Sequence, residues 1–297
     1  MAHSKLRLYI SFVRPANVVT AIADVIAGAA ISGFLSGGLT EPMPLLLLVL
    51  STVGLYGGGI VFNDIFDLKQ DQIERPERIL PSGKLSVNTA ITFGSILLLM
   101  GVLAAALVSW ISGAIAFSVA VLALTYDKFS KHVQVLGPLN MGLCRAGNLM
   151  LGVSIIPAAV GEFWWLGIIP VLFISAVTLT SQKEAEGNNK GSVTLALGLD
   201  VAILIILLLL VRLTDFRLEL AAVFMAMWFL MNASAKYKAI THNVPKNIMN
   251  AVRMGVLSLI PLDAAMAAGF SGKLWLGLVV LLLLPLSIAL AKKFAVT

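Results

Sequence analysis

The chain has 297 residues, of which 59% are hydrophobic and 12% are charged, and its mean hydropathy is +0.97. A soluble globular domain carries roughly 25% charged residues, so this composition excludes a soluble protein. The net charge of +6 comes without a patch of interleaved basic and aromatic residues, which argues against nucleic-acid binding. Cys144 is the only cysteine, which excludes an intrachain disulfide and a Cys-x-x-Cys metal site.

Windows of about 20 apolar residues predict membrane-spanning helices along the whole chain. Ten spans are expected, with nine as the alternative, near residues 16–36, 43–63, 90–109, 112–127, 138–158, 164–181, 196–212, 218–235, 248–269 and 274–291. Arg14 and Pro15 interrupt the N-terminus before the first span, so no cleavable signal peptide is expected. The sequence therefore predicts an all-α, polytopic membrane bundle, with residues 1–297 forming one domain.

The basic residues are distributed unevenly between the two predicted membrane faces. With an internal N-terminus, one face holds both termini and the loops 64–89, 128–137, 182–195 and 236–247, which together carry most of the 21 Lys and Arg residues. Loops rich in Lys and Arg stay in the cytoplasm. These loops and the N-terminus are therefore predicted to be cytoplasmic.

Three carboxylates and an amide lie where the second predicted span meets its longest polar loop. They are Asn63, Asp64, Asp67 and Asp71. On one continuous helix the acids occupy positions i, i+3 and i+7, so the side chains can point into one space. Converging carboxylates repel one another without a cation, and oxygen ligands favour Mg²⁺, which also takes substrate phosphate oxygens. The motif thus predicts a metal-bridged diphosphate site.

The loop that follows carries basic residues suited to a diphosphate. Arg75, Arg78 and Lys84 can neutralise its charge, and an Arg offers a bidentate fork to phosphate oxygens. The alternative is an ordinary basic cytoplasmic loop that only orients the protein in the membrane.

These motifs resemble those of the UbiA superfamily of intramembrane aromatic prenyltransferases. The family pattern NDxxDxxxD is matched by Asn63, Asp64, Asp67 and Asp71, and RPxRxLPSGxxS by residues 75–86. Other resembling positions along the chain are Arg14, Pro15 and Asn17 at the first span, Tyr126 and Lys131 after the fourth, and Arg145, Asn148 and Gly152 in the fifth. The resemblance thus covers most of the chain.

The resemblance implies nine helices around a central cavity, here with one extra C-terminal span, and a Mg²⁺-dependent transferase. An isoprenyl group would pass from a prenyl diphosphate to a lipophilic or aromatic acceptor within the membrane. The implied catalytic residues are Asp64, Asp67, Asp71 and Lys131, and the implied metal ligands are Asn63, Asp64, Asp67, Asp71 and Glu184. The implied substrate-binding residues are Asn17, Asn63, Arg75, Arg78, Tyr126, Arg145, Asn148, Lys183 and Glu184.

The family's second acidic motif is expected after the sixth span, which should end on the same membrane face as the second. There the usual Asp positions become Ser181, Glu184 and Asn188, so one carboxylate stands where three are usual. Lys183 is an alternative source of positive charge for the diphosphate, or a loop anchor at the interface. The reduced motif leaves open a non-catalytic isoprenoid-binding or transport protein. Residues 183–188 also resemble the UbiA-like branch known as EboC.

Two further charges lie within apolar segments. Arg145 is expected to face the bundle interior or a cavity, with diphosphate or an acid such as Asp127 as its partner. Asp263 follows Pro261, which predicts a kinked helix whose carboxylate faces protein.

Overall fold

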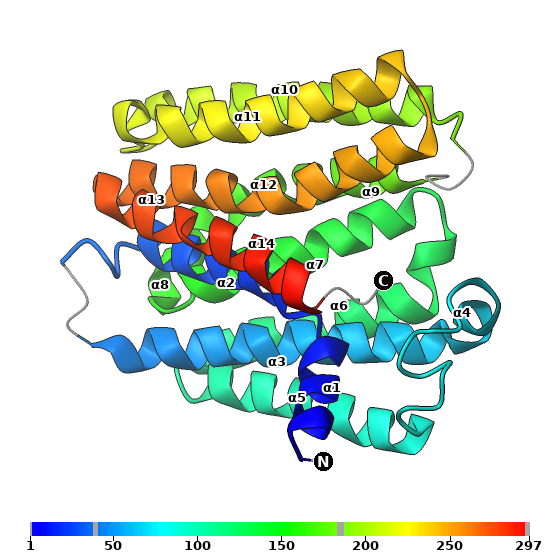
Figure 1. Ribbon diagram of the computed structural model, residues 1–297. Coiled ribbons are helices and arrows are strands. Elements are labelled where there is room, and N and C mark those ends of the chain that lie inside the picture. The colour runs from blue at the N-terminus through cyan, green and yellow to red at the C-terminus, as the bar shows by residue number, and fades with distance from the viewer. Residues whose placement is uncertain (1, 38–40, 183–186, 295–297) are drawn as a thin grey trace.

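The computed structural model describes residues 2–37, 41–182 and 187–294, and the regular secondary structure of this part of the chain is all helical (Figure 1). The α-helices are α1 (Ala2–Phe12), α2 (Pro15–Ile31), α3 (Pro42–Phe66), α4 (Leu68–Glu74), α5 (Val87–Ala106), α6 (Trp110–Lys128), α7 (Leu136–Val153), α8 (Pro157–Phe163), α9 (Ile168–Ser181), α10 (Lys190–Leu213), α11 (Leu218–Thr241), α12 (Pro245–Ser271), α13 (Leu274–Leu281) and α14 (Leu283–Phe294). Two short 3₁₀ turns, η1 (Ser130–His132) and η2 (Trp164–Gly167), join α6 to α7 and α8 to α9.

Eight helical segments of the described chain are long and apolar enough to cross a membrane, or nine if the pair bent by 58° between Phe12 and Pro15 counts as one span. Ten spans were expected. Helix α7 covers the fifth expected segment but falls short in hydropathy, because it carries Asn140, Arg145 and Asn148. The remaining expected segments correspond to helices or bent helix pairs, so the predicted helical membrane bundle is confirmed.

The long helices run side by side, with α10 and α11 on one flank and α3 and α5 on the other (Figure 1). Helices α3 and α9 end at the same end of the bundle, beside α4, as expected for the second and sixth spans. We call this end of the bundle the motif face, because it carries residues 63–78.

Helices α2 and α7 approach each other at backbone contact distance through two glycines. A Cβ atom on Gly28 would lie 2.3 Å from the Leu149 carbonyl oxygen, and one on Gly152 would lie 2.3 Å from that of Val25. Small residues allow this approach in membrane helices. The contact brings Asp24 of α2 beside Arg145 of α7.

The loop predicted at residues 236–247 starts later in the structure than expected. Helix α11 continues to Thr241, and Lys236 lies on its buried side with 0% of its side chain exposed. Its Nζ atom lies 2.5 Å from Oδ2 of Asp200 on α10. This acid neutralises the lysine, so a charged residue that read as part of a polar loop belongs to the helix interior.

Candidate active site

A cavity of about 390 Å³ lies between helices α2, α3, α6, α7, α9 and α12. Most of its wall is apolar, contributed by side chains such as Leu55, Ile60, Val119 and Leu259. The polar residues on its wall are Arg14, Asn17, Thr52, Tyr56, Asn63, Tyr126, Asp127, Arg145, Asn148, Thr178 and Ser181. The cavity therefore combines an apolar interior with convergent polar groups, as small-molecule sites do.

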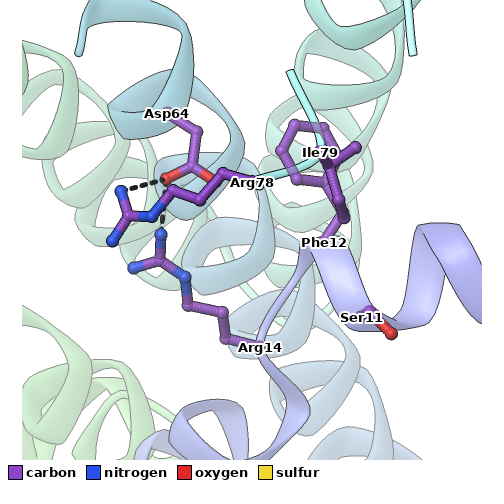
Figure 2. A pocket seen from close by; sticks show the side chains of 6 residues that line it. All are labelled: Ser11, Phe12, Arg14, Asp64, Arg78 and Ile79. Atoms are coloured by element: carbon purple, nitrogen blue, oxygen red, sulfur yellow. Dashed lines mark hydrogen bonds and ion pairs between the residues drawn. The ribbon is translucent and has the colours of Figure 1, made fainter. Parts of the chain in front are cut away.

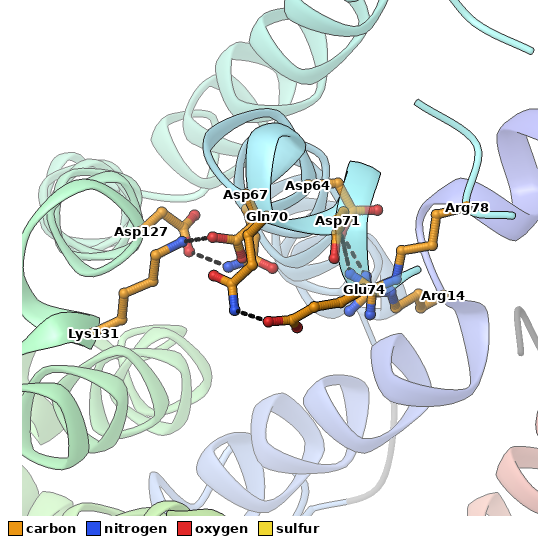
Figure 3. Close-up of polar contacts among 10 residues, drawn as sticks. Arg14, Asp64, Asp67, Gln70, Asp71, Glu74, Arg78, Asp127 and Lys131 are labelled. Carbon is orange, nitrogen blue, oxygen red and sulfur yellow. Dashed lines mark hydrogen bonds and ion pairs between the residues drawn. The ribbon is translucent and has the colours of Figure 1, made fainter. Parts of the chain in front are cut away.

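Asp64 and Asp71 lie on the motif face, where both face Arg78. The Arg78 Nη1 atom lies 2.7 Å from Asp71 Oδ2 and 3.8 Å from Asp64 Oδ1 (Figures 2 and 3). Both acids are buried, with 7% and 5% of their surfaces exposed. A single cationic nitrogen thus occupies the space between two buried carboxylates.

Arg14 contacts the same oxygen of Asp64, with Nη2 2.5 Å from Asp64 Oδ1 (Figure 2). It lies at the break between α1 and α2, in the left-handed backbone region with φ of 49°. A non-glycine residue rarely adopts this conformation, and Pro15 directly follows it. The break turns the Arg14 side chain toward α3, and Arg14 lines the main cavity as well as a smaller pocket of about 180 Å³.

Asp67 faces away from these residues and contacts Lys131 of η1 (Figure 3). Helix α3 ends at Phe66 and α4 begins at Leu68, so Asp67 stands at a helix break rather than on a continuous helix. The prediction that all four motif side chains point into one space is therefore wrong for this structure. In this structure Asp64 and Asp71 face Arg78, while Asp67 faces Lys131.

Asn63 makes a contact that the motif alone did not indicate. Its Nδ2 atom donates a hydrogen bond of 2.8 Å to Oδ1 of Asp127, near the end of α6. Asp127 is 4% exposed and lines the cavity. A fourth carboxylate, from outside the motif, therefore belongs to the site.

Arg145 and Asn148 border the inner end of the cavity, within a network that spans three helices. Arg145 Nε lies 2.6 Å from Asp24 Oδ2, and Asn148 Nδ2 donates to the same oxygen at 2.8 Å. Thr52 Oγ1 donates to Asn148 Oδ1 at 2.5 Å. The expected partners of Arg145, diphosphate or Asp127, are thus replaced by Asp24, because the close approach of α2 and α7 puts this acid beside it. Asp263 is buried next to Asp24, facing protein as expected.

The other predicted site residues are distributed unevenly. Asn17 and Tyr126 line the cavity, whereas Arg75 is exposed and belongs to neither pocket described above. Lys183 and Glu184 lie outside the described residues. Ser181, at the first position of the reduced second motif, does line the cavity.

The carboxylate and amide oxygens of the motif suit a cation that prefers oxygen ligands, although in this structure the acids are paired with basic side chains. Among the described residues, no three His, Cys, Asp or Glu side chains lie close enough together to hold a metal ion. The position of Arg78 nevertheless shows that Asp64 and Asp71 converge on a positive charge. Carboxylate and amide oxygens are the ligands Mg²⁺ takes, so the residues present fit this ion.

Two of these residues could have been given a role from sequence. Arg14 opens the Arg-Pro-x-Asn run of the first span, and a charge that precedes a proline at a span entrance is a signal of a fixed turn. Asp127 adjoins Tyr126 and precedes Lys131 by one helical turn, so it shares their end of the span. Their partners, Asp64 and Asn63, follow only from the packing of the helices.

Comparison with known proteins gives consistent matches in sequence and in fold. Residues 25–244 match the model of the UbiA prenyltransferase family. The digeranylgeranylglyceryl phosphate synthase of Sulfolobus acidocaldarius is 30% identical over 204 residues, covering 65% of this chain and 70% of that protein.

Two solved structures share the fold. One, from work on digeranylgeranylglyceryl phosphate synthase in membranes, has a TM-score of 0.69 at 23% identity and covers 91% of this chain and 99% of that one. The other is a UbiA homologue from Archaeoglobus fulgidus bound to GPP and Mg²⁺, with a TM-score of 0.62 at 14% identity, covering 87% and 99%.

Proposed function

The chain belongs to the UbiA prenyltransferase family and is a multi-pass membrane enzyme of prenyl transfer, and from this premise we propose how its site works. A prenyl diphosphate would place its diphosphate at the motif face and its isoprenoid tail in the cavity. One observation carries this proposal: the charged residues of the motif face adjoin a largely apolar cavity, because Arg14, which contacts Asp64, lines that cavity together with Asn63 and Asp127. That arrangement offers charged groups to the diphosphate and an apolar wall to the isoprenoid tail.

The cofactor proposed is Mg²⁺, which the related Archaeoglobus fulgidus protein binds together with GPP. Asp64 and Asp71, which already converge, would hold the ion together with Asn63 and Asp67 once Asp67 turns away from Lys131. When bound, Mg²⁺ neutralises the charge that develops on the leaving diphosphate. Glu184, the remaining proposed ligand, is outside the described residues.

The basic residues would then change partners. Arg14, Arg78 and Lys131 each contact a motif carboxylate in this structure. Once the carboxylates hold a cation, these bases are free to hold diphosphate oxygens, with Arg78 and Lys131 already on opposite sides of α3 (Figure 3). Charge-assisted contacts of this kind stabilise a leaving anion most strongly in a site that excludes water.

The cavity would hold the prenyl tail and part of the acceptor. Its volume of about 390 Å³ lies toward the low end of ligand sites, which measure roughly 300–1,000 Å³. Asn17, Tyr126, Arg145 and Asn148 would orient the acceptor from its wall. The name of the Sulfolobus relative supports a lipid-like, isoprenoid glyceryl phosphate acceptor as the first to test.

The family branch and the orientation in the membrane remain proposals. The similarity of residues 183–188 to EboC is not supported by the relative described above, which carries a synthase name. The excess of basic residues in the loops of the motif face supports a cytoplasmic location for that face and for the N-terminus.

The test is release of diphosphate from geranylgeranyl diphosphate and from shorter prenyl diphosphates by the purified protein. Mg²⁺ and a panel of lipophilic and aromatic acceptors are supplied, and the prenylated product is identified by mass spectrometry. We expect Mg²⁺-dependent turnover that falls about a hundredfold or more in Asp67→Ala, because an electrostatic contact to the leaving group is lost. Tight binding of prenyl diphosphate without turnover, across the whole acceptor panel, would contradict the proposal.

A further inference from the structure

Asp127 is a buried carboxylate that the family motif does not include. It lies near the end of α6 with 4% of its surface exposed, and it lines the cavity. Lys131, one turn further on, contacts Asp67 instead. Among the described residues, the side chain of Asp127 takes part in one hydrogen bond, in which Asn63 Nδ2 donates to its Oδ1 at 2.8 Å.

This contact has a defined direction. The amide of Asn63 turns its NH₂ group toward Asp127, whose carboxyl oxygen accepts the hydrogen bond. The amide oxygen of Asn63 therefore points away from Asp127. Within the described part of the chain, that oxygen accepts no hydrogen bond. An amide rotation that is otherwise free is thus set by a residue on the neighbouring helix.

The free oxygen belongs to the first residue of the acidic motif, one position before Asp64, and Asn63 also lines the cavity. Outer residues that orient a metal ligand through a hydrogen bond are common, and their removal weakens metal affinity about 10–100-fold. A carboxylate near the end of a membrane span is also costly to keep without a role.

We propose that Asp127 is a positioning residue that turns the Asn63 amide so that its oxygen is presented to the divalent cation of the site. This inference rests on the proposed function, because it requires that Asn63 bind the cation. Asp127 acts on the cation through Asn63 and is not itself a ligand of the cation. The acidic motif of this chain is therefore completed by a residue from α6, outside the motif.

The experiment measures binding of Mn²⁺ to the full-length protein in lipid nanodiscs by electron paramagnetic resonance, with unreactive geranyl thiolodiphosphate present. We expect Asp127→Leu and Asp127→Ala to weaken Mn²⁺ binding about 10–100-fold, because neither side chain can accept the hydrogen bond that fixes the Asn63 amide. Asp215→Asn is the charge-matched control, since Asp215 is exposed at the other end of the bundle. It should bind Mn²⁺ like the unmodified protein.

Asp127→Asn separates orientation from charge. It removes the negative charge but keeps an oxygen that can accept from the Asn63 amide. We expect its Mn²⁺ affinity to stay within about threefold of the unmodified protein, well inside the loss expected for Asp127→Leu and Asp127→Ala. An Asp127→Asn variant as weak as Asp127→Ala overturns the inference, as does normal Mn²⁺ binding by both Asp127→Leu and Asp127→Ala.

The outcomes also separate this inference from the proposed function. An unmodified protein that binds no Mn²⁺ overturns the proposed metal site and the positioning role together. An unmodified protein that binds Mn²⁺ while Asp127→Leu and Asp127→Ala bind it equally well overturns the positioning role alone. Where Asp127→Leu or Asp127→Ala does not fold, Asp127→Asn decides the question, because it keeps the shape and the acceptor: normal Mn²⁺ binding supports the positioning role, and weakened binding overturns it.

Discussion

Two ion pairs are buried within apolar helices of this protein, and they differ in what they face. Arg145 pairs with Asp24 at 2.6 Å and borders the cavity, together with Asn148. Lys236 pairs with Asp200 at 2.5 Å, and both side chains are 0% exposed and absent from the cavity wall.

The difference between the two pairs shows that a charge inside an apolar helix does not by itself indicate an active site. Ionisable residues within membrane spans are often functional, and both pairs would qualify on sequence alone. Each cation also lies 5.9 Å from the centre of an aromatic ring, that of Phe173 for Lys236 and that of Tyr56 for Arg145, so only contact with the cavity separates the two pairs. We therefore assign the Asp200–Lys236 pair to folding, and the Asp24–Arg145 pair to the cavity.

The largest effect on stability is expected from removing one member of the enclosed pair. Lys236→Met leaves Asp200 charged and buried without a partner, which should lower the free energy of unfolding by roughly 3–5 kcal/mol. Asp200→Asn combined with Lys236→Met removes both charges and should recover most of that loss. Thermal unfolding in detergent measures both.

Lys238→Met is the control for this prediction, because Lys238 lies on the same helix but is exposed. It should leave stability unchanged. If Lys236→Met unfolds normally yet loses prenyl transfer, the enclosed pair has a catalytic role and the distinction between the two pairs fails.

A smaller effect is expected from separating the helices that form the cavity pair. Gly28→Ala would place a Cβ atom 2.3 Å from the Leu149 backbone oxygen, so α2 and α7 must move apart. Overpacking of this kind costs roughly 1–3 kcal/mol. Because Asp24 and Arg145 bridge the same two helices, prenyl transfer should fall along with the melting temperature.

Gly198→Ala on α10 is the matched glycine control, since nothing lies within 4 Å of the added Cβ atom. Alanine is preferred to glycine inside a helix by roughly 0.5–1 kcal/mol, so this variant should melt at the same or a higher temperature. A Gly28→Ala protein with unchanged stability and activity would show that the close approach of α2 and α7 is not needed for the cavity pair.

The helices and the acidic motif could be predicted from sequence because their signals are local. Runs of apolar residues define the spans, and the spacing of Asp64, Asp67 and Asp71 identifies a cation site. Local spacing failed at Asp67, where one helix ends and another begins, so that the side chain turns toward Lys131. A helix break with no proline or glycine at that point leaves no strong signal in the sequence.

The long-range partners could not be predicted for a different reason. Asp24 and Arg145 meet because Gly28 and Gly152 let two helices touch, and Asp127 meets Asn63 because α6 packs beside the end of α3. Each partner is set by a crossing of helices far apart in the chain. A sequence shows that Arg145 needs an acid, but several acids satisfy that need equally well until the helices are packed.

The smallest effect is expected from a variant that removes one hydrogen bond from the network around the Asp24–Arg145 pair. Thr52→Val removes the donor to Asn148 Oδ1, which should lower stability by about 1 kcal/mol and weaken catalysis, because Asn148 also holds Asp24. Thr178→Val is the control on the same cavity wall, since Thr178 Oγ1 donates to the Ile174 carbonyl of its own helix. Kinetics with thermal unfolding should separate the two threonines. Equal losses in both variants would mean that the cavity wall responds to lost polarity in general, and that the network between α3, α7 and α2 has no particular role.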